Sequence, residues 1–188
     1  MITKTNILLF IISVFLFSSC EKQVSNEKQI LYYTTVGIEM KNTSILVNDF
    51  FHQTVKIIKE AQEVHDKKID SSKITLFTES YHESIFTLSK AINKLTTLKE
   101  IDQDINLKEK VLAYYKEVMM LQEATIPHLI NVLNNGVDNI TDKEREVFKN
   151  FQIRTPELQL KANELQKLSL DFQEKHHITE EQLTEYGL

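Results

Sequence analysis

Glycine and proline are scarce in this sequence. Its 188 residues include three glycines and two prolines, which is far below average usage. Because these residues mark most turns, their scarcity predicts few, long secondary-structure elements. It also excludes phosphate-cradling loops, dinucleotide-binding turns and the nucleophile elbow of serine hydrolases, which all need closely spaced glycines.

Cysteine is scarcer still, because it occurs only at position 20. A secreted domain is free to use disulfide bonds, but this chain has no second cysteine to pair with the first. The segment around Cys20 therefore decides how its thiol is used.

The first residues have the pattern of a secretion signal. Residues 1–4 carry one positive charge, and the eleven residues 7–17 are apolar except for one serine. As a helix, these eleven residues span about 16 Å, roughly half the hydrocarbon thickness of a bilayer. The pattern predicts a targeting element rather than a transmembrane anchor.

Two serines lie directly before Cys20, and small side chains fit a signal peptidase cleft. The segment from Leu16 to Cys20 resembles the lipobox of bacterial lipoproteins, with Phe17 where that family usually has leucine. The resemblance implies that residues 1–19 are a cleaved signal peptide and that the Cys20 thiol receives a diacylglycerol. It also implies acylation of the new amine, with chains such as palmitate, which together anchor a protein stably. A simple secretory signal followed by an incidental cysteine is the alternative.

Residues 20–26 are interpreted as a lipidated tether, and residues 27–188 as a single helical-bundle domain. In style they resemble uncharacterised helical lipoproteins of the Bacteroidota and spirochaetes. This resemblance implies a cell-envelope protein attached to a lipid bilayer, foremost the outer membrane, through acylated Cys20. An acidic run after the cysteine favours surface export in the Bacteroidota, but residues 21–23 supply one acid, so the periplasmic and surface faces both stay open.

Acidic residues outnumber basic ones. The chain has 22 basic and 27 acidic residues, and loss of Lys4 with the signal leaves a formal net charge of −6. We therefore expect no nucleic-acid partner and no attraction to anionic lipid by charge.

After the tether, apolar and small residues recur at steps of three and four, which predicts amphipathic helices. Polar residues that can bond the first free amides mark the starts, at residues 70–72, at Asn106 with Glu109, and at Thr141 with Glu144. The predicted helices cover residues 27–66, 71–99, 107–133 and 142–175, and Thr179 with Gln182 suggests a short fifth helix.

These segments predict an all-α fold, an up-down-up-down four-helix bundle with a long first helix and a short C-terminal helix. The first helix exceeds its partners by roughly ten residues. We expect this excess to overhang at the lipid-proximal end. Pro127 and Pro156 predict bends in the third and fourth helices.

Two Glu-x-x-His pairs have the spacing of ligands in di-iron bundles, namely Glu79 with His82 and Glu174 with His177. The direction of the side chains argues against a metal site. Phe77 and the apolar residues spaced with it form the predicted buried face of their helix, so Glu79 points away from the core. We therefore expect no metal ligands and no cofactor, and keep these four residues as candidates.

The histidines also form two other arrangements with the chemistry of metal or haem ligands. His176 and His177, near several glutamates, form a possible surface zinc or copper site, although a solvated helix end is the simpler interpretation. Met40 with either histidine roughly matches the haem ligands of some bundles.

In three pairs of adjacent aromatic residues, one ring lies on the apolar face of its predicted helix and the other lies about 100° further around the helix axis. The second rings, Tyr32, Phe50 and Tyr115, either form a partner interface or belong to a wide core. No constellation of catalytic residues was found, so the hypothesis is a non-enzymatic binding or structural lipoprotein, open to an envelope partner or self-association. The alternative is a carrier of a ligand, di-iron, zinc or haem in the bundle core.

Overall fold

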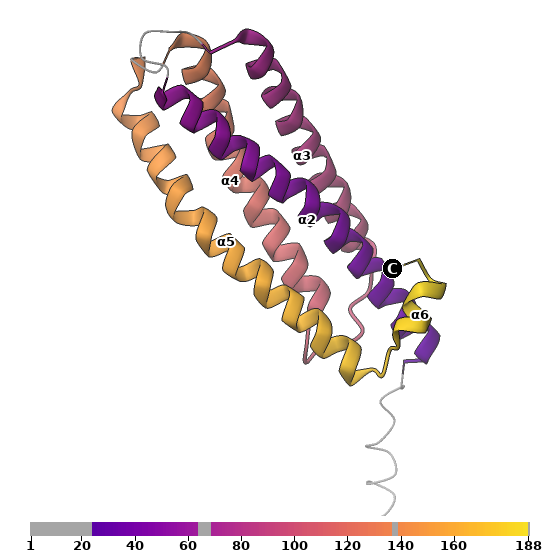
Figure 1. The fold of residues 1–188 in the computed structure, drawn as a ribbon. Helices are drawn as coiled ribbons and strands as arrows, with labels where there is room; N and C mark the ends of the chain where they lie inside the picture. The colour runs from indigo at the N-terminus through magenta and orange to yellow at the C-terminus, as the bar shows by residue number, and fades with distance from the viewer. Residues whose placement is uncertain (1–23, 64–68, 137–138, 188) are drawn as a thin grey trace, which may run out of the picture.

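A computed structural model describes residues 24–63, 69–136 and 139–187. The signal segment, the Leu16–Cys20 motif and the predicted end of the first helix at residues 64–66 lie outside the described residues. The described part is helical without strands: α2 (Asn26–Glu63), α3 (Ser71–Thr97), α4 (Leu107–Asn135), α5 (Asp142–Lys175) and α6 (Glu180–Glu185). The four long helices form an antiparallel bundle, and α6 lies at the end where α2 begins (Figure 1). The all-α bundle prediction is confirmed.

Local hydrogen bonds explain most of the helix starts. Asp70 accepts a bond from the Ser72 amide at 2.9 Å, where α3 begins. Thr141 and Glu144 form a reciprocal capping box at the start of α5, as predicted. Thr179 and Gln182 do the same for α6. Both prolines lie inside their helices, Pro127 in α4 and Pro156 in α5, and each helix continues past its proline.

The predicted cap at Asn106 is wrong. Asn106 has a left-handed backbone, with φ 55°, and its side chain makes no capping hydrogen bond. The first turn of α4 is satisfied instead by Glu100 and Tyr32, whose oxygens each lie 3.1 Å from the Lys108 amide nitrogen. A buried carboxylate from the preceding loop therefore replaces the local cap.

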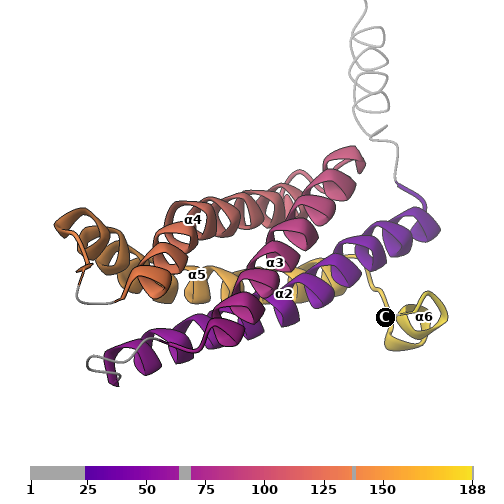
Figure 2. The same cartoon turned by 90° about the horizontal axis from the view of Figure 1, so that it is seen from above.

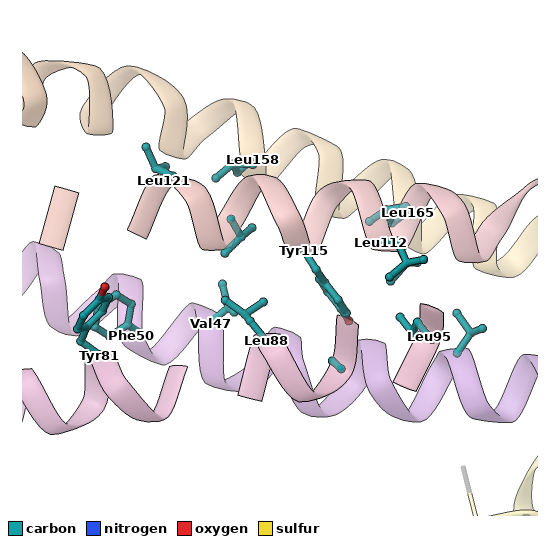
Figure 3. Close-up of a cluster of buried hydrophobic side chains, with 14 of the residues drawn as sticks. Val47, Phe50, Tyr81, Leu88, Leu95, Leu112, Tyr115, Leu121, Leu158 and Leu165 are labelled. Carbon is teal, nitrogen blue, oxygen red and sulfur yellow. The ribbon is translucent and has the colours of Figure 1, made fainter. Parts of the chain in front are cut away.

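α4 is the central helix of the core. It packs along both α3 and α5, and α2 packs along α3, whereas α2 and α5 touch at few positions (Figures 1 and 2). Tyr32, Phe50 and Tyr115 are each only 2% exposed, so these rings belong to a wide core and form no partner interface. Figure 3 shows Tyr115 reaching from α4 across to α2.

The extra length of α2 lies at its N-terminal end, as expected. Tyr32 is level with the connection between α3 and α4, because it bonds Glu100 and Lys108, so the residues before it extend past that connection. α6 packs against α2. Ile30 on the extension and Leu183 on α6 are both buried in the core.

Candidate functional site

A hollow of about 320 Å³ lies between α2 and α5 and is called here the α2–α5 groove. This volume is at the lower end of the roughly 300–1,000 Å³ typical of small-molecule sites. Its lining comes from α2, from α5 and, at the floor, from α4. These residues are Met40, Lys41, Ser44, Asn48, Tyr114, Tyr115, Gln159, Ala162, Asn163, Leu165 and Gln166.

The groove exists because α2 and α5 meet through large side chains at its two ends only. Toward the end of the bundle where α2 begins, Tyr33 stacks on Phe172 with ring centroids 5.7 Å apart. Toward the other end, Phe51 and Phe151 approach to 5.8 Å. Between these contacts, Ser44 on α2 and Ala162 on α5 have small side chains that do not span the gap. Two aromatic contacts therefore hold the helices around a hollow.

Two tyrosines of α4 contribute to the floor. The Tyr115 hydroxyl donates a hydrogen bond of 3.0 Å to the Glu39 carbonyl of α2, which fixes its ring beneath that helix. Tyr114 is half-buried, and its ring centroid lies 5.8 Å from that of Tyr115. Burial raises the pKa of both hydroxyls, so both stay neutral at physiological pH. The floor is rigid, aromatic and uncharged.

The rim of the groove is rich in carboxamides. Asn48, Gln159, Asn163 and Gln166 are all exposed. Within the part of the chain that the structure describes, none of these four side chains makes a hydrogen bond to protein, so their donors and acceptors are free. Lys41 is the one charged residue in the lining of this groove. The arrangement can bind a neutral polar ligand, and it holds no pair of groups placed for proton transfer.

A second polar cluster, the Glu100 clasp, lies at the end of the bundle where α2 begins. Glu100 Oε1 accepts from the Tyr32 hydroxyl at 2.6 Å and from the Ile101 amide at 2.9 Å. Its other oxygen accepts from the Lys108 amide. Burial and the adjacent Glu100 carboxylate raise the pKa of the Tyr32 hydroxyl, which therefore stays a donor. The clasp joins α2 to the loop before α4.

Asp102 extends this clasp to the end of α5. Its carboxylate lies 2.8 Å from both the Lys175 ammonium and His176 Nε2, and it accepts from the Ile105 amide at 3.1 Å. Burial alone raises the pKa of Asp102, but hydrogen bonds from Lys175, Ile105 and His176 outweigh it and lower the pKa to about 2. Because its oxygens are already partnered within the protein, we interpret the cluster as a structural tie.

The structure does not bring the four candidate metal ligands together. Glu79 and His82 are exposed on α3, and Glu174 and His177 are exposed at and beyond the end of α5. Across residues 24–63, 69–136 and 139–187, no three His, Cys, Asp or Glu side chains are grouped closely enough to hold a metal ion.

The two other histidine arrangements are also separated. His176 turns inward to Asp102 while His177 is exposed, so the two imidazoles do not face a common surface site. Met40 lines the groove, two helical turns from Tyr33, whereas His176 lies beyond Phe172 in the opposite direction. About 16 Å along the bundle separates them, too far for one haem iron.

The sequence alone did not identify the carboxamides on the rim of the α2–α5 groove. The available signal was a pair of small residues, Ser44 on α2 and Ala162 on α5, at positions where the spacing of three and four predicts core-facing side chains. Ser44 is exposed instead, because α2 and α5 do not close over it. Facing small positions predict a gap only once the two helices are known to be neighbours in the right register.

No described helix is long and apolar enough to cross a membrane. A comparison of the chain with protein-family models, with curated proteins and with solved structures found no match.

Proposed function

We propose that this chain is a lipid-anchored, non-enzymatic binding protein of the bacterial envelope, and that its binding site is the α2–α5 groove. The groove itself is the observation that carries the proposal. It combines a ligand-sized hollow, a rigid aromatic floor and a rim of unpartnered carboxamides. Such a set of convergent polar groups around an apolar base is typical of small-molecule sites.

The lining, in which Lys41 is the one charged residue, supports binding rather than catalysis. The tyrosine hydroxyls of the floor have raised pKa values, and the rim amides do not titrate. General acid or base catalysis needs a group whose pKa lies near the working pH. The ionised carboxylate of Asp102 belongs to the clasp at the end of the bundle where α2 begins, and Lys175 and His176 are already its partners.

The anchor part of the proposal rests on Cys20 and its distance from the bundle. α2 begins at Asn26, six residues after Cys20, and six residues reach at most about 20 Å. Lipidated Cys20 would therefore hold the end of the bundle where α2 begins close to the bilayer surface. The clasp and α6 stabilise that same end.

Metabolic labelling with an alkyne-modified palmitate tests the anchor. The wild-type chain should incorporate label and fractionate with membranes. Cys20→Ala should lose the label and accumulate as uncleaved precursor. Ser19→Ala keeps a small residue before the cysteine and should behave as wild type. Cleavage and membrane retention of Cys20→Ala at wild-type levels would overturn the lipoprotein proposal.

Elemental analysis tests the binding function against a metal carrier. The protein is purified without a metal-affinity tag and without chelators. We expect substoichiometric metal. Stoichiometric iron, zinc or copper that is lost on replacing His82 or His177 would contradict the proposed function and favour the carrier.

A further inference from the structure

We propose that the ligand of the α2–α5 groove is a neutral saccharide, held by the rim carboxamides over the tyrosine floor. This inference rests on the proposed binding function and names its substrate class. It follows from three properties of the lining: its hydrogen-bonding character, its floor and its charge.

The rim can both donate and accept hydrogen bonds at every position. Each carboxamide offers an NH₂ and a carbonyl oxygen, and the Ser44 hydroxyl offers one donor and two acceptor sites. Sugar hydroxyls likewise donate and accept at one atom, and N-acetyl groups offer an amide. Gln159, Asn163 and Gln166 of α5 recur at helical steps along one wall, with Asn48 and Ser44 of α2 opposite. A ligand with polar groups on both edges matches this arrangement.

The floor suits the less polar face of a sugar ring. Tyr114, Met40 and Leu165 present ring, thioether and methyl surface between the two polar walls. A pyranose has polar hydroxyls at its edges and C–H groups on its faces, so it can lie on such a surface while its edges bond the rim. Tyrosine provides this rigid apolar area at low entropic cost.

Charge and length favour a short neutral ligand over the other classes. Lys41 is the single charge in the lining, which is too little for a phosphorylated ligand. The α2 wall from Met40 to Asn48 extends about 12 Å. An extended peptide rises about 3.3 Å per residue, so this wall would contact only about four residues of one. A short saccharide uses the same length fully.

Isothermal titration calorimetry of the full-length protein tests the inference, in a detergent without a sugar headgroup. The probes are maltotriose, cellotriose, mannotriose and triacetylchitotriose, with acetyl-tetraalanine-amide as the neutral peptide. At least one trisaccharide should bind saturably with a Kd of millimolar or tighter. Ala162→Phe, which fills the groove, should weaken that binding at least tenfold.

Two further variants make the result specific. Asn163→Leu removes a rim amide at an exposed position and should weaken saccharide binding without changing the circular dichroism spectrum. Ala124→Phe adds the same ring at an exposed site on α4 outside the groove, and it should bind as wild type.

Three results would overturn the saccharide inference, and they bear differently on the proposed function. Binding of the peptide alone, weakened by Ala162→Phe, would leave the groove as a binding site with another ligand class. Saccharide binding that Ala162→Phe does not change would remove the groove from both proposals. No heat with any trisaccharide at millimolar concentration would reject the saccharide, while the labelling of Cys20 decides the anchor separately.

Discussion

Replacing Gln122 with methionine should stabilise this protein, although it removes a polar side chain. Gln122 lies on α4 and is fully buried, at 0% exposure. Within the described residues, neither its amide nitrogen nor its amide oxygen has a hydrogen-bond partner. A buried polar group without a partner costs about 1–3 kcal/mol, because it loses its bonds to water and gains none.

Methionine removes this cost without opening a cavity. It has the same unbranched length as glutamine and fills irregular core space well. We therefore expect Gln122→Met to raise the free energy of unfolding by about 1–3 kcal/mol. At about 2–4 °C per kcal/mol for a chain of this size, the midpoint of thermal unfolding should rise by about 2–12 °C.

Urea unfolding followed by circular dichroism at 222 nm measures the effect. Gln152→Met, at an exposed position on α5, is the matched control and should change stability by less than about 0.5 kcal/mol. The reasoning is refuted if Gln122→Met destabilises the fold by 1 kcal/mol or more at an unchanged m-value. That result would mean that the amide is hydrogen-bonded in the folded protein.

The remaining predictions concern the clasp and the caps, and urea unfolding tests each. Because the pKa of Asp102 is about 2, below its ordinary 3.8, its carboxylate stabilises the fold above about pH 4, and this stability is lost as pH falls towards 2. Asp102→Asn should therefore lower the free energy of unfolding by about 2 kcal/mol at pH 7 and remove most of the loss of stability between about pH 4 and pH 2. An unchanged loss of stability over this pH range contradicts the stabilising role of the Asp102 carboxylate. Tyr32→Phe should cost about 2 kcal/mol, because Glu100 loses a donor, and Tyr33→Phe, the control, should cost clearly less; equal costs contradict the clasp. Thr141→Ala should cost about 1 kcal/mol, and a neutral result contradicts the capping box.

The helices and most of their starts could be predicted because their determinants are local. Thr141 and Glu144 are three residues apart, so the capping box is visible in the sequence, and the structure has it. The apolar spacing of α3 likewise predicts which of its faces is buried, and Phe77 on that face is buried as expected.

What could not be predicted depends on contacts between distant segments. The true cap of α4 involves Tyr32, 76 residues before the amide that it accepts from. Phe50 and Phe51 are adjacent on α2, and only the positions of α3 and α5 decide that Phe50 is the fully buried ring. The groove arises in the same way, since Ser44 and Ala162 leave a gap only because α2 and α5 are neighbours there. Periodicity locates a core face but does not identify which helix covers it.

The intact mass of the protein extracted from the membranes of its own cells is the decisive test of the proposed lipid anchor at Cys20. We expect a chain that begins at Cys20 and carries the added mass of a diacylglycerol, with or without a further acyl chain on the amine. Ser19→Ala should give the same modification. A mass that corresponds to the uncleaved chain, or to a chain cleaved elsewhere without lipid, would contradict the lipid-anchored binding protein proposed here.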